Sequence, residues 1–120
     1  MSKQIIQSNK VPAPIGPYSQ AVIANGFLFA SGQIAFDPAT GELVLSSIEA
    51  ETTQVMENIK AILDEAKISF EPIVKTSIFL SSMDLFAAVN QVYGSYFTAD
   101  FPARETVAVK TLPRNVNVEI

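Results

Sequence analysis

Residues 21–30 read AVIANGFLFA, and this stretch sets the architecture of the chain. Two runs of β-prone residues, at 21–24 and 27–34, are joined by Asn25 and Gly26. An Asn-Gly pair between such runs is a strong signal for a β-hairpin with a two-residue turn. Both runs carry apolar residues at consecutive positions, so both faces of the hairpin are hydrophobic. Helices on one side leave the other side uncovered, and we therefore expect that face to be buried in a homo-oligomer.

A long amphipathic helix is predicted to follow the hairpin. Ser46 and Glu49 have the spacing of a capping box at its start. The side chains beyond the cap recur three and four residues apart, as on one buried face of a helix of about five turns. This stripe consists of Ile48, Thr52, Val55, Met56, Ile59, Ile62, Leu63 and Ala66.

The remaining segments alternate between strand and helix signals. A first strand is expected within residues 3–10, before a proline-rich loop at 11–17. Further strands are expected at residues 73–80, 106–112 and 116–120, and a second helix from Asp84 to about Phe97. This order predicts an α+β sandwich in which two helices pack on one face of a mostly antiparallel sheet.

The composition predicts one compact domain, residues 1–120, with 48% hydrophobic and 17% charged residues. The chain has no cysteine and no histidine, which excludes disulfides and histidine-dependent nucleophilic catalysis and disfavours a transition-metal site. A net charge of -4 disfavours binding to nucleic acid, because such binding depends on clustered lysine and arginine. There is no nucleotide-binding motif, no signal-peptide pattern and no span long enough to cross a bilayer, so we expect a cytoplasmic protein.

Several polar residues at the ends of the predicted elements are candidates for chemistry. Arg104 follows Pro102 and precedes a β-like run, and a guanidinium fixed there suits a carboxylate held by two parallel hydrogen bonds. The alternative is an ordinary ion pair with Glu105. The other candidates are Tyr18, Ser31, Gly32, Gln33, Asn90 and Glu119. Each also has a structural explanation, such as ring packing, a β-bulge, a bond to the backbone or a surface acid.

Five motifs in register give these candidates a common context. They read GPYSQA at 16–21, FASGQI at 29–34, VNQVY at 89–93, FPAR at 101–104, and LP at 112–113 followed by VEI at 118–120. From about residue 8 to its end the chain resembles the reactive intermediate deaminase family (Rid, also called YjgF), and within it the RidA imine-deaminase subgroup.

The resemblance implies a chorismate-mutase-like fold of the bacillus type, with a mixed, mostly antiparallel six-stranded sheet and two helices on one face. It also implies a homotrimer in which three sheets form a central barrel, with the helices outside and a cleft at each subunit interface. Such a trimer would cover the second hydrophobic face of the hairpin.

The resemblance further implies an enzyme, a 2-iminobutanoate/2-iminopropanoate deaminase. It would hydrolyse 2-imino acids, or 2-enamine tautomers such as 2-aminoacrylate, to 2-oxo acids and ammonia. Serine and threonine dehydratases that depend on pyridoxal phosphate release these intermediates. The deaminase itself would need no cofactor and no metal.

The resemblance also assigns a role to each candidate. Arg104 would hold the substrate carboxylate, Glu119 would position and deprotonate water, and Tyr18 would donate a hydrogen bond near the substrate. The cleft would be lined by Ser31, Gly32, Asn90 and Thr106, the last through its backbone.

Two departures from the family pattern give further expectations. A carboxylate at Glu105, where a small residue is common, is expected either to compete for Arg104 or to repel an anionic substrate. The chain ends one residue after Glu119, so the last strand is expected to be short and to hold Glu119 weakly. These departures leave open a non-catalytic, carboxylate-binding or regulatory trimer. A role in translation or RNA cleavage, described for some family members, fits poorly with the acidic charge.

Overall fold

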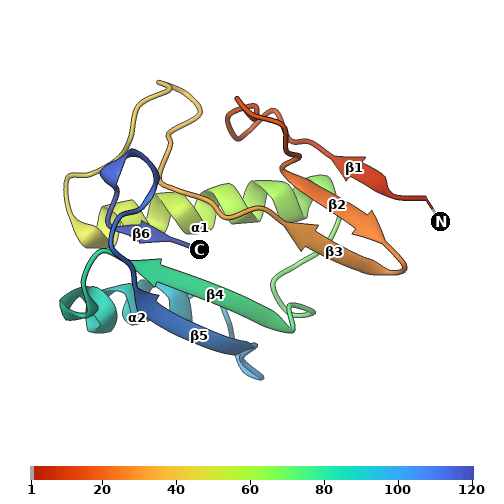
Figure 1. The fold of residues 1–120 in the computed structure, drawn as a ribbon. Helices are drawn as coiled ribbons and strands as arrows, with labels where there is room; N and C mark the ends of the chain where they lie inside the picture. The colour runs from red at the N-terminus through yellow and green to blue at the C-terminus, as the bar shows by residue number, and fades with distance from the viewer. Residues whose placement is uncertain (1) are drawn as a thin grey trace.

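The computed structural model describes residues 2–120 as an α+β fold with helices behind two sheets (Figure 1). In chain order the elements are β1 (Gln4–Ile6), β2 (Ala21–Ala24), β3 (Phe27–Ala30), α1 (Ile48–Glu65), β4 (Lys75–Leu80), the short 3-10 helix η1 (Met83–Leu85), α2 (Phe86–Gly94), β5 (Ala103–Ala108), the short 3-10 helix η2 (Pro113–Asn115) and β6 (Val118–Glu119). The predicted order of strands and helices is therefore confirmed.

The six strands form two three-stranded sheets rather than one continuous six-stranded sheet. The first has the order β1-β2-β3 and is antiparallel throughout. The second has the order β5-β4-β6, with β5 parallel and β6 antiparallel to β4. Gln33 joins the two, since its N–H donates to the Ile120 carbonyl at 2.8 Å and its carbonyl accepts from the Ile120 N–H at 3.2 Å. The strand predicted to reach residue 34 ends at Ala30 because the chain then crosses from one sheet to the other.

The hairpin has the turn that its Asn-Gly pair predicts. Asn25 and Gly26 both adopt positive φ, at 51° and 81°, as the two central residues of a tight hairpin turn require. The register pairs Ala24 with Phe27 on either side of this turn. The turn therefore positions β3 against β2 without a bulge.

The boundaries of several other elements differ from the prediction. The first strand covers only Gln4–Ile6 of residues 3–10. The second helix ends at Gly94, because the N–H groups of residues 95–97 bond to carbonyls three residues back, which tightens the chain into turns. The strand expected to begin at Thr106 begins at Ala103, directly after Pro102. Arg104 is therefore part of a strand and not of the loop before it.

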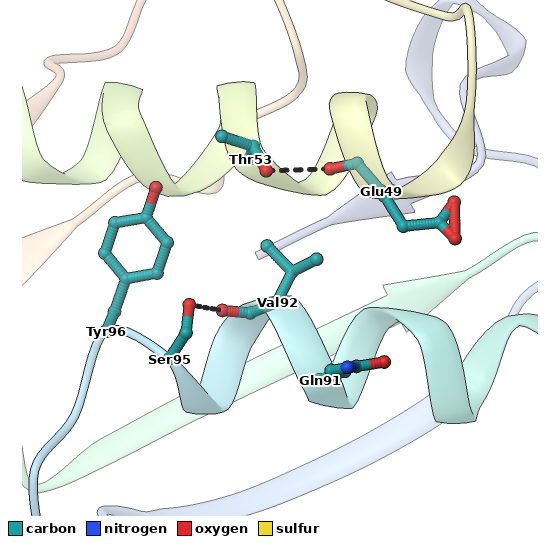
Figure 2. A pocket seen from close by; sticks show the side chains of 6 residues that line it. All are labelled: Glu49, Thr53, Gln91, Val92, Ser95 and Tyr96. Atoms are coloured by element: carbon teal, nitrogen blue, oxygen red, sulfur yellow. Dashed lines mark hydrogen bonds between the residues drawn. The ribbon is translucent and has the colours of Figure 1, made fainter.

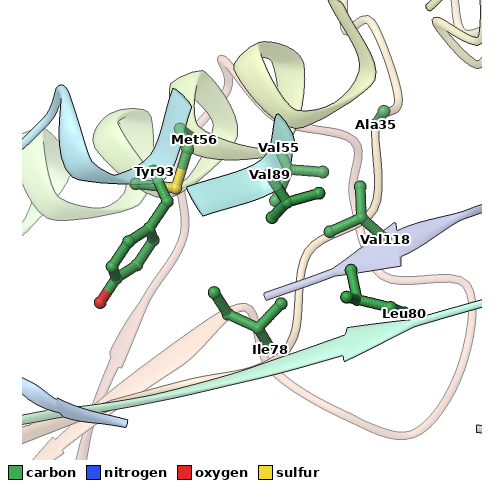
Figure 3. Packing of buried hydrophobic residues seen from close by; sticks show 8 residues of the cluster. All are labelled: Ala35, Val55, Met56, Ile78, Leu80, Val89, Tyr93 and Val118. Carbon is green, nitrogen blue, oxygen red and sulfur yellow. The ribbon is translucent and has the colours of Figure 1, made fainter. Parts of the chain in front are cut away.

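Both helices cover the same face of the β5-β4-β6 sheet (Figure 3). The core there combines side chains of α1, α2, β4 and β6: Val55, Met56, Val89, Tyr93, Ile78, Leu80 and Val118, together with Ala35. The second half of α1 packs on the hairpin sheet, where Ala61 and Ile62 contact Ile6 and Ala21. Helix α1 is thus the element that holds the two sheets together.

The opposite face of the sheets carries large apolar side chains. Phe27 and Phe29 are 57% and 59% exposed, and Val107 of β5 is 43% exposed. Leu28 packs toward α1, so its neighbours Phe27 and Phe29 point away from the helices. The prediction that the hairpin is hydrophobic on both faces is confirmed. Within residues 2–120, no helix has both the length and the apolar character needed to cross a bilayer.

The N-terminus of α1 is capped by Ser47, not by the predicted pair Ser46 and Glu49. The Ser47 hydroxyl oxygen accepts from the Ala50 N–H at 3.0 Å. The predicted capping box is wrong by one residue, because the helix begins at Ile48 and its third residue is Ala50, which has no side chain to bond back to the cap.

We expect Ser47→Ala to lower the free energy of unfolding by about 1 kcal/mol, since one terminal N–H loses its partner. Ser46→Ala is the matched control and is expected to change this free energy by less than about 0.5 kcal/mol. Urea denaturation of the two variants provides the measurement. Equal losses in both would contradict the assignment of the cap to Ser47.

Candidate active site

Arg104 lies on β5 and is held by side chains of α2. Its Nη1 donates to Asn90 Oδ1 at 2.7 Å. Its Cζ lies 5.2 Å from the centre of the Tyr93 ring and 5.6 Å from that of Phe86, within the range of cation–π attraction. The Tyr93 hydroxyl is fixed in turn by a 2.7 Å hydrogen bond with the Thr76 hydroxyl. These contacts orient the guanidinium and use one of its five N–H groups.

A concavity of about 460 Å³ opens beside this guanidinium. Its lining consists of Asn90, Tyr93, Gly94, Phe101, Pro102 and Arg104. The walls are therefore mainly aromatic and apolar, with one positive charge and one amide as the polar groups. Such a lining suits a small anion that also carries a carbon skeleton.

Glu105 does not compete for Arg104. Successive residues on a strand point to opposite faces of a sheet, so Glu105 points away from α2. Its carboxylate forms an ion pair with Lys75 at 2.8 Å and accepts a short hydrogen bond from Ser77. The hydrogen bond from Lys75, followed by that from Ser77, holds the pKa of Glu105 below its usual value. The expectation that Glu105 occupies the guanidinium is thus wrong.

Thr106 presents backbone groups at a free sheet edge. The N–H groups of Ala103 and Val109 donate to carbonyls at either end of β4, so odd-numbered residues of β5 bond to β4. The N–H and C=O groups of Arg104 and Thr106 therefore point to the edge at which the described part of the chain places no neighbouring strand. The Thr106 hydroxyl is also buried without a hydrogen-bond partner among residues 2–120.

Glu119 lies on β6 beside Gly32, on the other face of the sheet. A Cβ atom at Gly32 would come within 3.1 Å of Glu119 Cδ, so the absence of a side chain at Gly32 makes room for this carboxyl group. Glu119 is half-buried, and this burial raises its pKa above the usual 4.5. A carboxylate with a raised pKa accepts a proton more readily at neutral pH.

Ser31 connects Gly32 to the segment that carries Tyr18. The Ser31 hydroxyl donates to the Ser19 carbonyl at 2.7 Å, and the Ser31 N–H donates to the Gln20 carbonyl at 2.9 Å. Tyr18 precedes these two residues and is 55% exposed. Tyr18, Ser31, Gly32 and Glu119 thus belong to one region of the fold.

The predicted site residues therefore form two separate groups in one protomer. Arg104 is opposite Thr76 in the register of the sheet, and Glu119 is opposite Phe79. The two residues lie three positions apart along β4, two strands apart and on opposite faces, which separates their backbones by about 14 Å. One small substrate cannot contact both side chains of the same protomer.

Sequence reasoning missed Phe86 and Tyr93 as supports for Arg104. Both residues fit the apolar face of the predicted second helix, and Tyr93 also ends the VNQVY motif, but neither pattern indicates a contact with Arg104. Their positions with Asn90 along one face of α2, together with the pairing of β5 with β4, create the contact.

A second concavity, of about 450 Å³, lies between α1 and α2 (Figure 2). Its hydroxyl donors are already used, since Thr53 donates to the Glu49 carbonyl, Ser95 to the Val92 carbonyl and Tyr96 to Glu57. Burial and the bond to Glu57 raise the pKa of Tyr96. None of the predicted site residues lines this groove. Across residues 2–120, no group of three or more acidic side chains is arranged to hold a metal ion.

Comparison with known proteins gives one consistent result. Residues 8–120 match the family described as endoribonuclease L-PSP. A RutC family protein of Synechocystis sp. is 50% identical over 122 residues, which span 100% of this chain and 94% of that protein. The chloroplastic Reactive Intermediate Deaminase A of Arabidopsis thaliana is 41% identical over 120 residues, spanning 100% of this chain and 64% of that protein.

The fold is also similar to that of solved structures. The crystal structure of a Rid family protein from Yersinia pestis superposes with a TM-score of 0.96 at 46% identity, covering 98% of this chain and 94% of that one. At this identity the likeness extends to the sequence as well as the fold.

The raised pKa of Glu119 gives its contribution to stability a definite sign. Between the usual value of 4.5 and the raised value, the folded state binds more protons than the unfolded state, so this contribution falls as pH rises. We expect the free energy of unfolding of wild type, minus that of Glu119→Gln, to decrease from about pH 4 to pH 7. Glu105→Gln is the control of opposite sign, because the pKa of Glu105 is lowered and its contribution is lost as pH falls. A flat difference for Glu119→Gln would contradict its burial.

Proposed function

The chain belongs to the Rid family of reactive intermediate deaminases, and we propose that it hydrolyses 2-imino acids to 2-oxo acids and ammonia. The substrates would be small, such as 2-iminopropanoate, 2-iminobutanoate and their enamine tautomers, including 2-aminoacrylate. Dehydratases that act on serine and threonine with pyridoxal phosphate would supply them. The proposal assigns the chemistry to Arg104 and Glu119 and requires no cofactor.

The observation that carries this proposal is the division of the site residues between two faces of the sheet. Arg104 offers free N–H groups at a sheet edge, while Glu119 lies on the opposite face, which also exposes Phe27 and Phe29. A homotrimer whose open faces meet would bury these side chains and bring Arg104 of one protomer against Glu119 of the next. The cleft would then lie between protomers.

The substrate would be held at its carboxylate and at its imine nitrogen. Arg104 binds the carboxylate through two parallel hydrogen bonds, since Asn90 uses only one of its N–H groups. The free backbone carbonyl of Thr106 accepts from the iminium N–H, and this aligns the electrophilic carbon with the facing carboxyl group. Tyr18, Ser31 and Gly32 would line the other wall.

Hydrolysis then requires one water molecule and the transfer of its proton. Glu119 accepts a proton as the water oxygen bonds to the imine carbon and the C=N electron pair moves to nitrogen. Glu119 returns this proton to the nitrogen of the tetrahedral adduct. The carboxylate then accepts the adduct's hydroxyl proton as the C–N bond breaks, which releases ammonia, leaves the 2-oxo acid, and passes the last proton to solvent. Protonated imines react readily with water, so positioning accounts for most of the catalysis required.

An assay with 2-imino acids generated by a serine or threonine dehydratase tests the reaction. We expect the wild-type protein to accelerate loss of the imine, and Arg104→Ala to reduce kcat/KM by roughly 100-fold, as the loss of a charged bidentate contact implies. Glu105→Ala is the matched control on the next residue and should retain activity. Imine loss no faster than in buffer would overturn the reaction and favour a carboxylate-binding trimer.

A mixing experiment tests whether the site spans two protomers. Arg104→Ala and Glu119→Gln proteins are each expected to keep only about a hundredth of wild-type activity. Dissociating and reassembling them together should restore about a quarter of the interfaces, since sites pair at random in mixed trimers. Light scattering should report three protomers for each protein. Failure to regain activity in mixed trimers would contradict a shared site.

A further inference from the structure

Glu51 is a buried carboxylate that the proposed reaction does not use. It lies in the first half of α1 and is 0% exposed. No lysine or arginine within the described residues forms an ion pair with it. Its Oε2 accepts from the N–H groups of Asn117 at 2.8 Å and Val118 at 3.1 Å, and its Oε1 accepts from Asn117 Nδ2 at 2.9 Å. Three N–H donors therefore replace the water that this charge would otherwise bind.

These contacts act on the short strand that carries Glu119. Strand β6 contains only Val118 and Glu119, and on one side it pairs with β4. On its other side no strand within residues 2–120 faces Val118, and the Glu51 carboxylate accepts the N–H hydrogen bond that a neighbouring strand would accept. Ile120 is bound on that side by Gln33. The backbone around Glu119 is thus fixed from both sides, by β4 on one and by Glu51 and Gln33 on the other.

We propose that Glu51 is a positioning residue that holds β6 in register, so that the Glu119 carboxyl group lies against Gly32 and faces the substrate. This inference rests on the proposed function, in which Glu119 handles the water proton. The expectation that a short final strand would hold Glu119 weakly is therefore wrong, because Glu51 accepts one hydrogen bond from Val118 of the strand and two from Asn117 directly before it.

The anchoring depends on reach and on acceptor geometry more than on charge. Glutamine at position 51 is as long as glutamate, and its carbonyl oxygen can accept both backbone N–H groups. Its amide nitrogen would then face the Asn117 side chain. That side chain can rotate by half a turn, so that Asn117 Oδ1 accepts from the glutamine. Asn117 Nδ2 would then donate to the Ser81 hydroxyl, which at present donates to Asn117 Oδ1. Alanine offers no acceptor, and aspartate is one methylene too short to reach all three donors.

Steady-state kinetics of hydrolysis distinguish these variants. We expect Glu51→Ala to lower kcat by roughly 10- to 100-fold with KM within about twofold of wild type, because a carboxyl group displaced by about 1 Å loses its alignment while Arg104 still binds substrate. Glu51→Gln should stay near wild type, and Glu51→Asp should fall between. Thr52→Ala is the control: it removes a buried hydroxyl next to Glu51 that, within the described residues, hydrogen-bonds only to the Ile48 carbonyl of α1. It should leave kcat unchanged.

Nuclear magnetic resonance supplies a readout that does not depend on hydrolysis. Glu51→Ala is expected to speed amide exchange at Asn117 and Val118 and to move the pKa of Glu119 back toward its usual value, whereas Glu51→Gln should preserve both. If wild type does not hydrolyse imines, the proposed function fails, and these spectra still decide whether Glu51 positions Glu119.

Two results would overturn the inference. One is wild-type kcat and an unchanged Glu119 titration in Glu51→Ala. The other, which also decides the question if Glu51→Ala does not fold, is full activity in Glu51→Asp together with loss of activity in Glu51→Gln. That pattern would mean that the charge at position 51, and not the length of its side chain, matters.

Discussion

The alternation of side chains along β4, β5 and β6 is the constraint on which the rest of the structure depends. One set of alternate residues, including Ile78, Leu80 and Val118, forms the core beneath the helices. The other set faces away from the helices and includes Glu105, Val107 and Glu119. The same alternation that builds the core thus separates Arg104 from Glu105 and from Glu119. The alternation of side chains along the strands therefore accounts both for the packed core of the protomer and for the placement of Arg104 and Glu119 on opposite faces.

Helix α1 connects the parts of the fold that this alternation separates. Its two ends pack on different sheets, with Val55 and Met56 on one and Ala61 and Ile62 on the other. It also carries Glu51, which binds the last strand on the side where no other strand among the described residues pairs with it. The helix that covers the core therefore also orders the segment that carries Glu119. The packing of α1 and the position of the proposed proton acceptor thus depend on each other.

The proposed reaction makes modest demands on such a scaffold. An imino acid has one carboxylate and one electrophilic carbon. Its hydrolysis therefore requires one cation, one proton acceptor and an apolar surface that excludes bulk water. Arg104 is oriented by Asn90 and by two aromatic rings, and burial raises the pKa of Glu119, the proposed proton acceptor. The exposed phenylalanines of β3 favour burial of this face against another protomer, which is what the proposed trimer requires.

The sequence by itself determined the local elements and the identity of the candidate site residues. The Asn25-Gly26 turn, the stripe of α1, the hydrophobic hairpin and the candidates Arg104, Asn90 and Glu119 all follow from patterns within a few residues, and the motifs carry the family. Only the tertiary structure decided where β5 begins, that Glu105 binds Lys75, that Phe86 and Tyr93 flank Arg104, and that Glu51 anchors β6. Each of these depends on the register between segments far apart in the chain, and a shift of one residue in that register moves every side chain of a strand to the opposite face.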